Sequence, residues 1–354
     1  MLSLLFFLVS FSVLLSYVFI KVSIPLFEKY RILDNPKKYG KKRAPIPYWV
    51  GIIFFIIFFI STFIFFEISQ KLLIIWIFGW IVTLVSFFDD RCNVSPKFRL
   101  LMQIIIGAVI WLTSIKIGYV SNIFWWVIEL ENIFITLFYH QIYLIPIIFT
   151  IFWYVFIFNA LNWTDGIKGN TSILSFVCFL VIFLLWMKLY FTDTYSAWVE
   201  NAEFIMQLSL ILLSILAVFI FFDVREKVLM GDAGTMFLGF MLATLAIISW
   251  GKVATVLAVF GIYAVDAIYV VVRRIIAGKN PLKGDFTHLH HRLLDIWLSE
   301  TQVLFLVSWL SFVFWFAALF LETLWKLVVF CIIIVLVLWL SYIWEHVKKI
   351  TFKK

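Results

Sequence analysis

The sequence predicts an all-α polytopic membrane protein with about eleven transmembrane helices. Hydrophobic residues make up 65% of the 354 residues and charged residues only 14%, a composition far outside that of soluble domains. The apolar residues form runs of about 20, the length of a helix that crosses a bilayer, whereas strands of a membrane barrel have about ten residues of alternating polarity. The charged residues gather in the short segments between these runs.

The predicted spans, in chain order, are 3–27, 46–66, 71–88, 100–118, 142–161, 171–191, 204–222, 232–249, 253–273, 301–321 and 326–344. No cleavage site of small residues follows the first span, so we expect a retained helix and not a signal peptide. The segment 119–141 either lies along the membrane interface or forms a small hairpin. We find no soluble domain and no internal repeat, so a single transmembrane domain is expected to fill 1–354, and a secondary transporter is disfavoured.

Basic residues predict the orientation of the chain. With the N-terminus outside, 22 of the 28 Lys and Arg residues fall in inner segments, namely 28–45, 89–99, 162–170, 223–231, 273–300 and 345–354. This bias predicts a cytoplasmic C-terminus. The net charge of +8 then reflects membrane orientation. Nucleic-acid binding is not expected, because no long basic stripe with stacking aromatic residues lies outside the bilayer.

Asp89 and Asp90 end the third span, where the helix C-terminus carries partial negative charge. Two adjacent carboxylates there need a cationic partner. Lys97 and Arg99 could neutralise them in a charged loop, or a divalent metal at a phosphate site could do so. The second interpretation lets one Asp accept a proton or orient a phosphate while its neighbour binds the metal.

Two further inner segments contain polar side chains that suit a phosphate or sugar ligand. Lys41, Lys42 and Arg43 either anchor the first loop to anionic lipid or reach over a phosphate-bearing substrate. Asn159 and Asn162 share one face of a helix end, where amides are costly unless they are paired. They fit hydrogen bonds to a sugar, a nucleobase or phosphate oxygens, and the Asp165-Gly166 turn follows them.

The last two inner segments leave alternatives open. Asp232 could cap the eighth span through the amide near Thr235, or Gly231 and Gly234 could let a phosphate approach this helix N-terminus. His288, His290 and His291 lack Cys or Glu ligands at zinc spacing, so they form either a solvated basic loop or, with Arg292, a clamp for oxyanions. Asp266 lies inside a span, seven and eight residues before Arg273 and Arg274, and an internal pairing is at least as well supported as catalysis.

Together these motifs resemble the polyprenyl-phosphate N-acetylhexosamine-1-phosphate transferase superfamily, also called glycosyl transferase family 4. The resemblance covers nearly the whole chain and rests on DDRCNVSPKFR, NALNWTDGIKG, GDAGTMFLG and HLHHRL, in this order, each on an inner segment. The HLHHR form is similar to the WecA-type branch, which takes UDP-N-acetylglucosamine or related sugars. Two departures are Lys168, where many relatives have Asp in a DGxDG pattern, and Val50-Gly51 in place of a Gly-Gly pair.

The resemblance implies an enzyme in which a lipid phosphate attacks the sugar-linked phosphorus of a UDP-N-acetylhexosamine, most simply UDP-GlcNAc. UMP leaves, and a lipid-linked sugar diphosphate forms on undecaprenyl phosphate, which starts a cell-envelope glycan at the cytoplasmic face of the plasma membrane. The implied ion is Mg²⁺, with Mn²⁺ as the alternative, held by Asp232 and Asp89. Members often dimerise, so a homodimer is compatible with the resemblance.

The resemblance also assigns roles to residues. Asp89 would deprotonate or orient the lipid phosphate, with Asp90 supporting it, and Asp232 would complete the catalytic set. The substrate-binding residues would be Lys42, Arg43, Lys97, Asn159, Asn162, Asp165, His288, His290, His291 and Arg292.

Three rival interpretations remain. An MraY-like transfer of phospho-MurNAc-pentapeptide is disfavoured by the histidine pattern, whereas a different UDP-N-acetylhexosamine remains open because of Lys168. A lipid-sugar transporter would place charged groups near mid-membrane, where only Asp266 clearly lies. A scaffold protein would not explain the acid pair or the clustered histidines.

Overall fold

The computed structural model describes residues 2–36, 43–92, 94–113, 115, 119–121, 127–129, 134–137, 140–192, 196–249, 253–280, 287–296, 298–320 and 323–351. Its helices are α1 (Leu2–Lys29), α2 (Gly51–Phe65), α3 (Gln70–Cys92), α4 (Pro96–Trp111), α5 (Leu144–Asn162), α6 (Asn170–Thr192), α7 (Ser196–Asp223), α8 (Gly231–Ile248), α9 (Val253–Ile276), α10 (Leu289–Asp295), α11 (Glu300–Phe320) and α12 (Thr323–Thr351). Each predicted span overlaps one of these helices, and only the short α10 has no predicted counterpart.

Seven helices in the described part of the chain are long and apolar enough to cross a membrane: α1, α3, α5, α6, α7, α8 and α12. The apolar helices α2 and α11 have shorter apolar stretches, Gly51–Phe65 and Glu300–Phe314. The chain is therefore a helical, multi-pass membrane protein.

Four short strands qualify the all-α prediction. β1 (Tyr119–Ser121) pairs antiparallel with β2 (Val127–Glu129), and β3 (Phe134–Leu137) pairs antiparallel with β4 (His140–Tyr143). They lie in and just after the segment for which the sequence left a small hairpin open. Each sheet has only two strands, so the strands decorate a helical protein and do not form its core.

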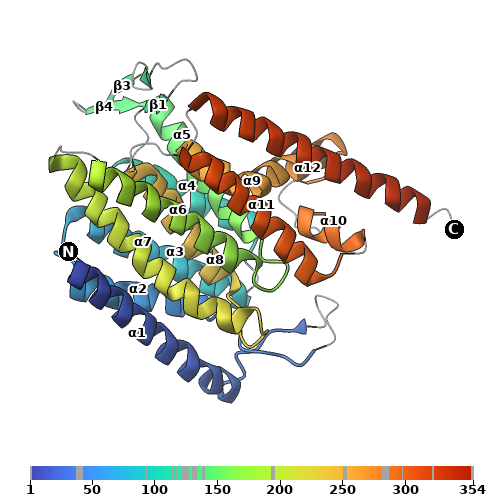
Figure 1. Ribbon diagram of the computed structural model, residues 1–354, viewed down its shortest axis with the longest axis horizontal. Helices are drawn as coiled ribbons and strands as arrows, with labels where there is room; N and C mark the ends of the chain where they lie inside the picture. The colour runs from blue at the N-terminus through green and yellow to red at the C-terminus, as the bar shows by residue number, and fades with distance from the viewer. Residues whose placement is uncertain are drawn as a thin grey trace.

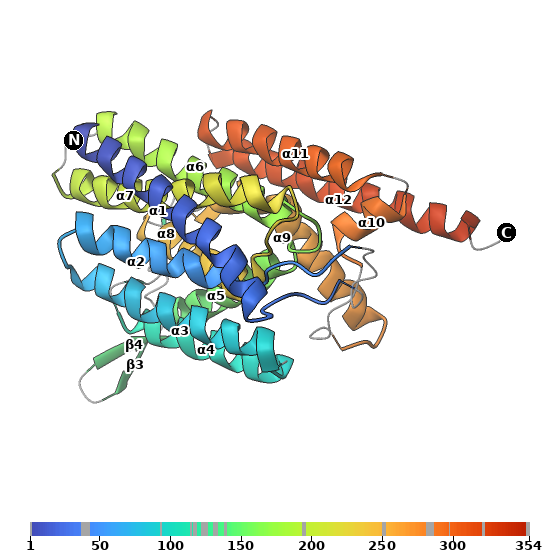
Figure 2. The same cartoon turned by 90° about the horizontal axis from the view of Figure 1, so that it is seen from below.

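The two ends of the helix bundle carry different segments of the chain. The N-terminus and the β3–β4 hairpin lie at one end, whereas α10 and the C-terminus lie at the other (Figures 1 and 2). The same arrangement is visible in both perpendicular views. The segments with the candidate site residues connect the helices at the α10 end, and this brings residues far apart in sequence into one region.

The central helix of the bundle is α8, in which 89% of the residues are buried. It packs against α2, α3, α5 and α6. Small residues permit this close packing, as is usual for helices inside membranes. At its first turn, a Cβ added to Gly51 would overlap the backbone of Gly234, so α2 and α8 touch backbone to backbone. This contact fixes the start of α8, the part that bears Asp232.

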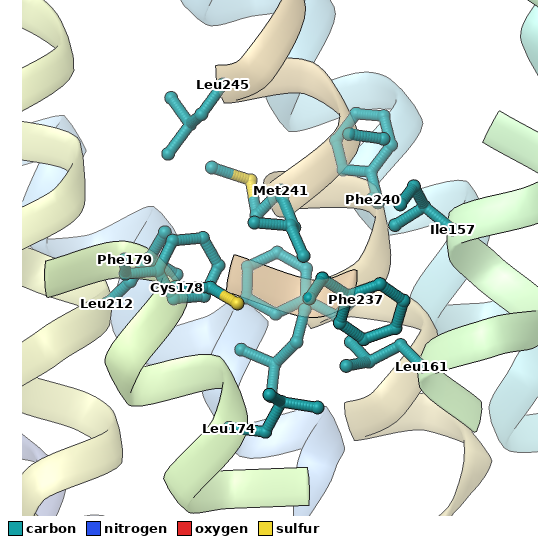
Figure 3. Close-up of a cluster of buried hydrophobic side chains, with 14 of the residues drawn as sticks. Ile157, Leu161, Leu174, Cys178, Phe179, Leu212, Phe237, Phe240, Met241 and Leu245 are labelled. Carbon is teal, nitrogen blue, oxygen red and sulfur yellow. The ribbon is translucent and has the colours of Figure 1, made fainter. Parts of the chain in front are cut away.

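Apolar side chains fill the space around α8. Figure 3 shows Phe237 and Met241 of α8 among side chains of α5, α6 and α7, such as Leu161, Phe179 and Leu212. All five side chains are 0% exposed. Side chains that are fully enclosed in this way move little. The core therefore holds the end of α5 and the start of α8, which bear Asn162 and Asp232, at a fixed distance from each other.

Candidate active site

Asp89 lies in the last turn of α3 and is only 6% exposed. Its Oδ2 lies 3.1 Å from Nη1 of Arg99. Its Oδ1 accepts a hydrogen bond of 2.8 Å from the backbone N–H of Val94. Ser95 then caps α4 by accepting from the N–H of Phe98 at 3.3 Å. Arg99 at the start of α4 thus lies next to the carboxylate that ends α3.

Asp90 has a different set of partners. Its Oδ1 accepts from the hydroxyl of Tyr48 at 2.8 Å and from the backbone N–H of Asp232 at 3.1 Å. Its Oδ2 accepts from the N–H of Ala233 at 3.3 Å. A carboxylate at a helix N-terminus satisfies free amides and interacts favourably with the helix dipole. The penalty for an acid at the end of α3 is therefore offset at the start of α8.

These contacts correct one alternative drawn from the sequence. Asp232 is not the cap of α8: it lies in the first turn, and no side-chain cap comes from the residue that precedes the helix. The hydroxyl of Thr235 donates to the backbone carbonyl of Asp232 at 3.1 Å instead. Because Asp90 caps the helix, the carboxylate of Asp232 is available for other partners.

The carboxylate of Asp232 joins the end of α3 to the end of α5. Its Oδ2 lies 3.2 Å from Nη1 of Arg99, the same nitrogen that contacts Asp89. Its Oδ1 accepts from the amide of Asn162 at 3.0 Å, and this amide also donates to Thr235 at 2.9 Å. We call Asp89, Asp90 and Asp232 the acid cluster. The side chain of Asp232 is 27% exposed, against 6% for that of Asp89.

Asn159 lies one turn before Asn162 and faces α4. Its amide donates to Oε1 of Gln103 at 2.7 Å and to the backbone carbonyl of Val155 at 2.7 Å. Gln103 is 6% exposed. Both amides at the end of α5 are therefore paired within the protein, with Asn162 at the acid cluster and Asn159 behind it.

The turn after α5 connects the acid cluster to the histidines. Asp165 is exposed and accepts from the hydroxyl of Thr171 at 3.2 Å. A Cβ at Gly166 would overlap the ring of His290. The ring of Trp163 stacks on that of His288, with centroids 5.1 Å apart. Since Asn162 bonds Asp232 and the next residue stacks on His288, the two groups of site residues lie close together.

His290 is the most enclosed of the histidines, at 1% exposed. Neither ring nitrogen has a hydrogen-bond partner within the described part of the chain. Burial, followed by the charges of His291, His288 and Arg292, holds the pKa of His290 well below its ordinary value. The ring is therefore neutral at physiological pH. His291 is half-buried, with its ring centroid 4.1 Å from that of His290.

Arg292 points into the protein. It is 1% exposed, pairs with Asp266 and donates to the hydroxyl of Ser341. Nδ1 of His288 lies 3.1 Å from the other carboxylate oxygen of Asp266. The structure thus confirms an internal pairing of Asp266, one of the two interpretations that the sequence left open, with His288 and Arg292 as its partners. Arg292 is buried in this pairing, so it does not form the oxyanion clamp that was expected with the histidines.

The other basic residues of these segments pair with acids outside the acid cluster, are exposed, or lie outside the described residues. Arg43 binds both oxygens of Asp34, at 2.7 and 3.1 Å, and lies 3.8 Å from Glu226. Lys168 pairs with the same Glu226 at 3.8 Å. Lys97 is exposed on the first turn of α4. Lys41 and Lys42 lie outside the described residues.

Three side chains at the site had no predicted role in binding or catalysis: Arg99, Tyr48 and Thr235. Arg99 could have been chosen over Lys97 only by knowing which face of α4 meets α3. Tyr48 follows a Pro-rich segment and gives no local signal. Thr235 lies three residues after Asp232, a spacing that places both on one face of a helix.

The donor set at the acid cluster suits a magnesium ion. Within the described residues there is no group of three or more His, Cys, Asp or Glu side chains that could hold a metal. Mg²⁺ usually binds one or two carboxylates and completes its shell with water and substrate phosphates. Asp89 and Asp232 come from different helices and face one nitrogen of Arg99, so a pair of carboxylates of this kind is present.

A bundle of apolar helices with acids, amides and histidines at one end defines a polytopic membrane protein with a polar site at that end of the bundle. The family model described as glycosyl transferase family 4 matches residues 72–250, about half of the chain. The chain therefore belongs to glycosyl transferase family 4. The matched region contains α3 from Leu72 onward and all of α4 to α8, and with them the whole acid cluster.

The names of similar proteins agree with this family. A Bacillus subtilis protein, named a probable undecaprenyl-phosphate N-acetylglucosaminyl 1-phosphate transferase, is 25% identical over 75% of this chain and 70% of its own length. The undecaprenyl-phosphate alpha-N-acetylglucosaminyl 1-phosphate transferase of Escherichia coli is 26% identical over 64% of this chain and 59% of its own length. The Salmonella typhi protein of the same name is 25% identical over 83% and 78%. These names support the WecA-type resemblance.

Proposed function

We propose that this protein transfers N-acetylglucosamine 1-phosphate from UDP-N-acetylglucosamine to undecaprenyl phosphate and releases UMP. The observation that supports this most strongly is the acid cluster, in which Asp89 and Asp232 flank Arg99 beside Asn162 at the end of a membrane-embedded bundle. This site is polar on one side and surrounded by apolar helices. There the lipid phosphate could keep its chain in the membrane and the nucleotide sugar could stay in water while the two phosphates meet.

The reaction requires positioning and charge neutralisation more than covalent chemistry. An oxygen of the lipid phosphate attacks the sugar-linked phosphorus, and the bond between the two phosphates of the UDP-sugar breaks. Asp89 orients the lipid phosphate or takes its remaining proton. Arg99 lies between two carboxylates and can offer its guanidinium to the diphosphate. Asp90 holds the first turn of α8 and so fixes Asp232.

A divalent ion belongs to this proposal. Asp232 and Asp89 would hold Mg²⁺, or Mn²⁺ in its place, which would neutralise the negative charge of the diphosphate and of the departing UMP. Asn162 keeps the carboxylate of Asp232 oriented through its amide. The exposed Asp165 and the histidines across the Trp163 turn would contact the nucleotide and sugar.

The proposal places the N-terminus outside, the C-terminus in the cytoplasm and the site at the cytoplasmic face of the plasma membrane. The excess of Lys and Arg in the inner segments supports this orientation. In this orientation about eleven helices cross the bilayer, and the whole chain forms one catalytic domain.

The alternatives have weaker support. The relatives' names specify N-acetylglucosaminyl 1-phosphate transfer, which favours this reaction over transfer of phospho-MurNAc-pentapeptide. A transporter would need ionisable groups along a path through the membrane. Asp266, which lies inside a predicted span, is paired with His288 and Arg292 and so does not line such a path.

The test is UMP release by the purified protein across a panel of UDP-sugars, with and without undecaprenyl phosphate and Mg²⁺. We expect release from UDP-N-acetylglucosamine only when lipid and ion are both present. Asp232→Asn should abolish release, whereas Glu28→Gln, the same chemical change at an exposed acid of α1, should not. Release without the lipid, or only from UDP-MurNAc-pentapeptide, would contradict the proposal.

A further inference from the structure

A single buried carboxylate organises the start of α10. Asp266 of α9 is 1% exposed. Its Oδ2 lies 3.1 Å from Nδ1 of His288 and accepts from the backbone N–H of Leu289 at 3.0 Å. Its Oδ1 pairs with Nη2 of Arg292. All three partners belong to residues 288–292, which we call the histidine segment, so the position of this segment depends on one acid.

The same acid is part of a buried pair that other helices enclose. The guanidinium of Arg292 also contacts Ser341 of α12 and lies over the ring of Tyr269, 4.8 Å from its centroid. Arg292 is therefore held by α9 and α12 and does not face the acid cluster. Removing one member of a buried ion pair strongly destabilises a protein, whereas replacing both with apolar groups often does not.

The consequence for His288 is chemical as well as structural. A carboxylate at Nδ1 requires a proton on that nitrogen and leaves Nε2 directed away from the acid. One face of the ring stacks on Trp163, at an interplanar angle of 27°. The ring of His290 lies 6.3 Å from it, nearly parallel. The ring of His288 is therefore held at its Nδ1 edge by Asp266 and on one face by Trp163, the residue that follows Asn162.

We propose that Asp266 is a positioning residue for the histidine segment: it fixes the protonated nitrogen and the orientation of His288, and thereby places α10 against the Trp163–Gly166 turn. This inference rests on the proposed function, because the histidine segment would contact the sugar nucleotide. Asp266 itself does not touch substrate.

Two double variants separate positioning from folding. Asp266→Leu with Arg292→Met removes both buried charges and also the acceptor for His288. Asp266→Asn with Arg292→Met removes both charges but keeps an amide oxygen that can accept from Nδ1. We expect both to unfold within a few degrees of one another. The Leu variant should turn over at least tenfold more slowly than the Asn variant.

Histidine ¹⁵N NMR in detergent supplies a measurement that does not depend on activity. The chain has five histidines, and His288→Gln assigns the signal of interest. The unchanged protein and the Asn variant should carry the proton on Nδ1, and the Leu variant should show mixed tautomers. Equal turnover in both double variants, or a His288 signal without a proton on Nδ1 in the unchanged protein, would overturn the inference. If the unchanged protein transfers no sugar phosphate, the proposed function fails, but the NMR comparison still decides the role of Asp266.

Discussion

Oδ1 of Asp90 lies 3.1 Å from the backbone nitrogen of Asp232, so the acid at the end of α3 holds the helix that bears the third acid of the cluster. The two residues are 142 positions apart in sequence. Their contact joins the C-terminus of one helix to the N-terminus of another, and the two helix dipoles meet at one carboxylate.

Replacing Asp90 with Ala should destabilise the protein and displace Asp232. Loss of a helix cap costs about 1 kcal/mol. The hydroxyl of Tyr48 also loses its acceptor. We expect a lower unfolding temperature in detergent and at least a tenfold loss of UMP release. Tyr48→Phe, which removes only the hydroxyl, should have a smaller effect on both. Full activity in Asp90→Ala would show that the cap does not position Asp232.

Gly166→Ala should impair transfer without preventing membrane insertion. The added methyl group would overlap the ring of His290, so the turn or the histidine segment must move. Displacements of about 1 Å near a reacting centre can cost a hundredfold in rate. The matched control is Gly278→Asn, because Gly278 has nothing within 4 Å of an added Cβ and Asn tolerates its φ of +66°. Equal rates for the two variants would refute this contact as a determinant of activity.

Removal of divalent ions should stop transfer, and added Mg²⁺ should restore it. Mn²⁺ should substitute and give an electron paramagnetic resonance signal of bound ion. This signal should be lost in Asp232→Asn and kept in Glu28→Gln. Turnover in excess chelator would refute the metal assignment, because the acid cluster would then act without an ion.

Acidification should destabilise the protein partly through His290. Burial lowers the pKa of His290 in the folded state, whereas an unfolded histidine has a pKa of about 6.5. The folded state therefore loses stability as the pH falls below about 6.5 towards the lowered value, because only the unfolded chain binds the proton. The unfolding temperature of His290→Met should decrease less between pH 7.5 and 5.5 than that of the unchanged protein. His346→Gln, at an exposed position of α12, should leave the slope unchanged; an unchanged slope in His290→Met would contradict the assignment.

The helices were predictable because each needs only local information. A run of apolar residues about 20 long has one stable solution in a bilayer. Each predicted span overlaps a helix, although the bounds differ, as for 100–118 against Pro96–Trp111 of α4. The acid pair at the end of α3 was also visible, because a charge at the end of an apolar run is a local signal.

What sequence could not supply was the direction of side chains and the partners across helices. Lys97 and Arg99 are two residues apart on α4 and so point to different faces, and only Arg99 meets the acids. Arg292 follows two histidines, yet it turns inward to Asp266. The cap of α8 by Asp90 joins segments 142 residues apart, and no local pattern encodes such a distance.

The enclosed position of α8 has a consequence for how the protein is made. Its hydropathy of 1.6 is the lowest among the seven apolar helices, which otherwise range from 2.2 to 2.7. A segment of this kind enters lipid less readily by itself, because its glycines and polar residues are compensated only by neighbouring helices. The ribosome completes α2, α3 and α5 before α8 emerges, so the earlier helices can receive it. Formation of the catalytic end thus depends on helices that have already assembled. Truncation before α8 would leave the apolar and polar surfaces that face α8 without a partner.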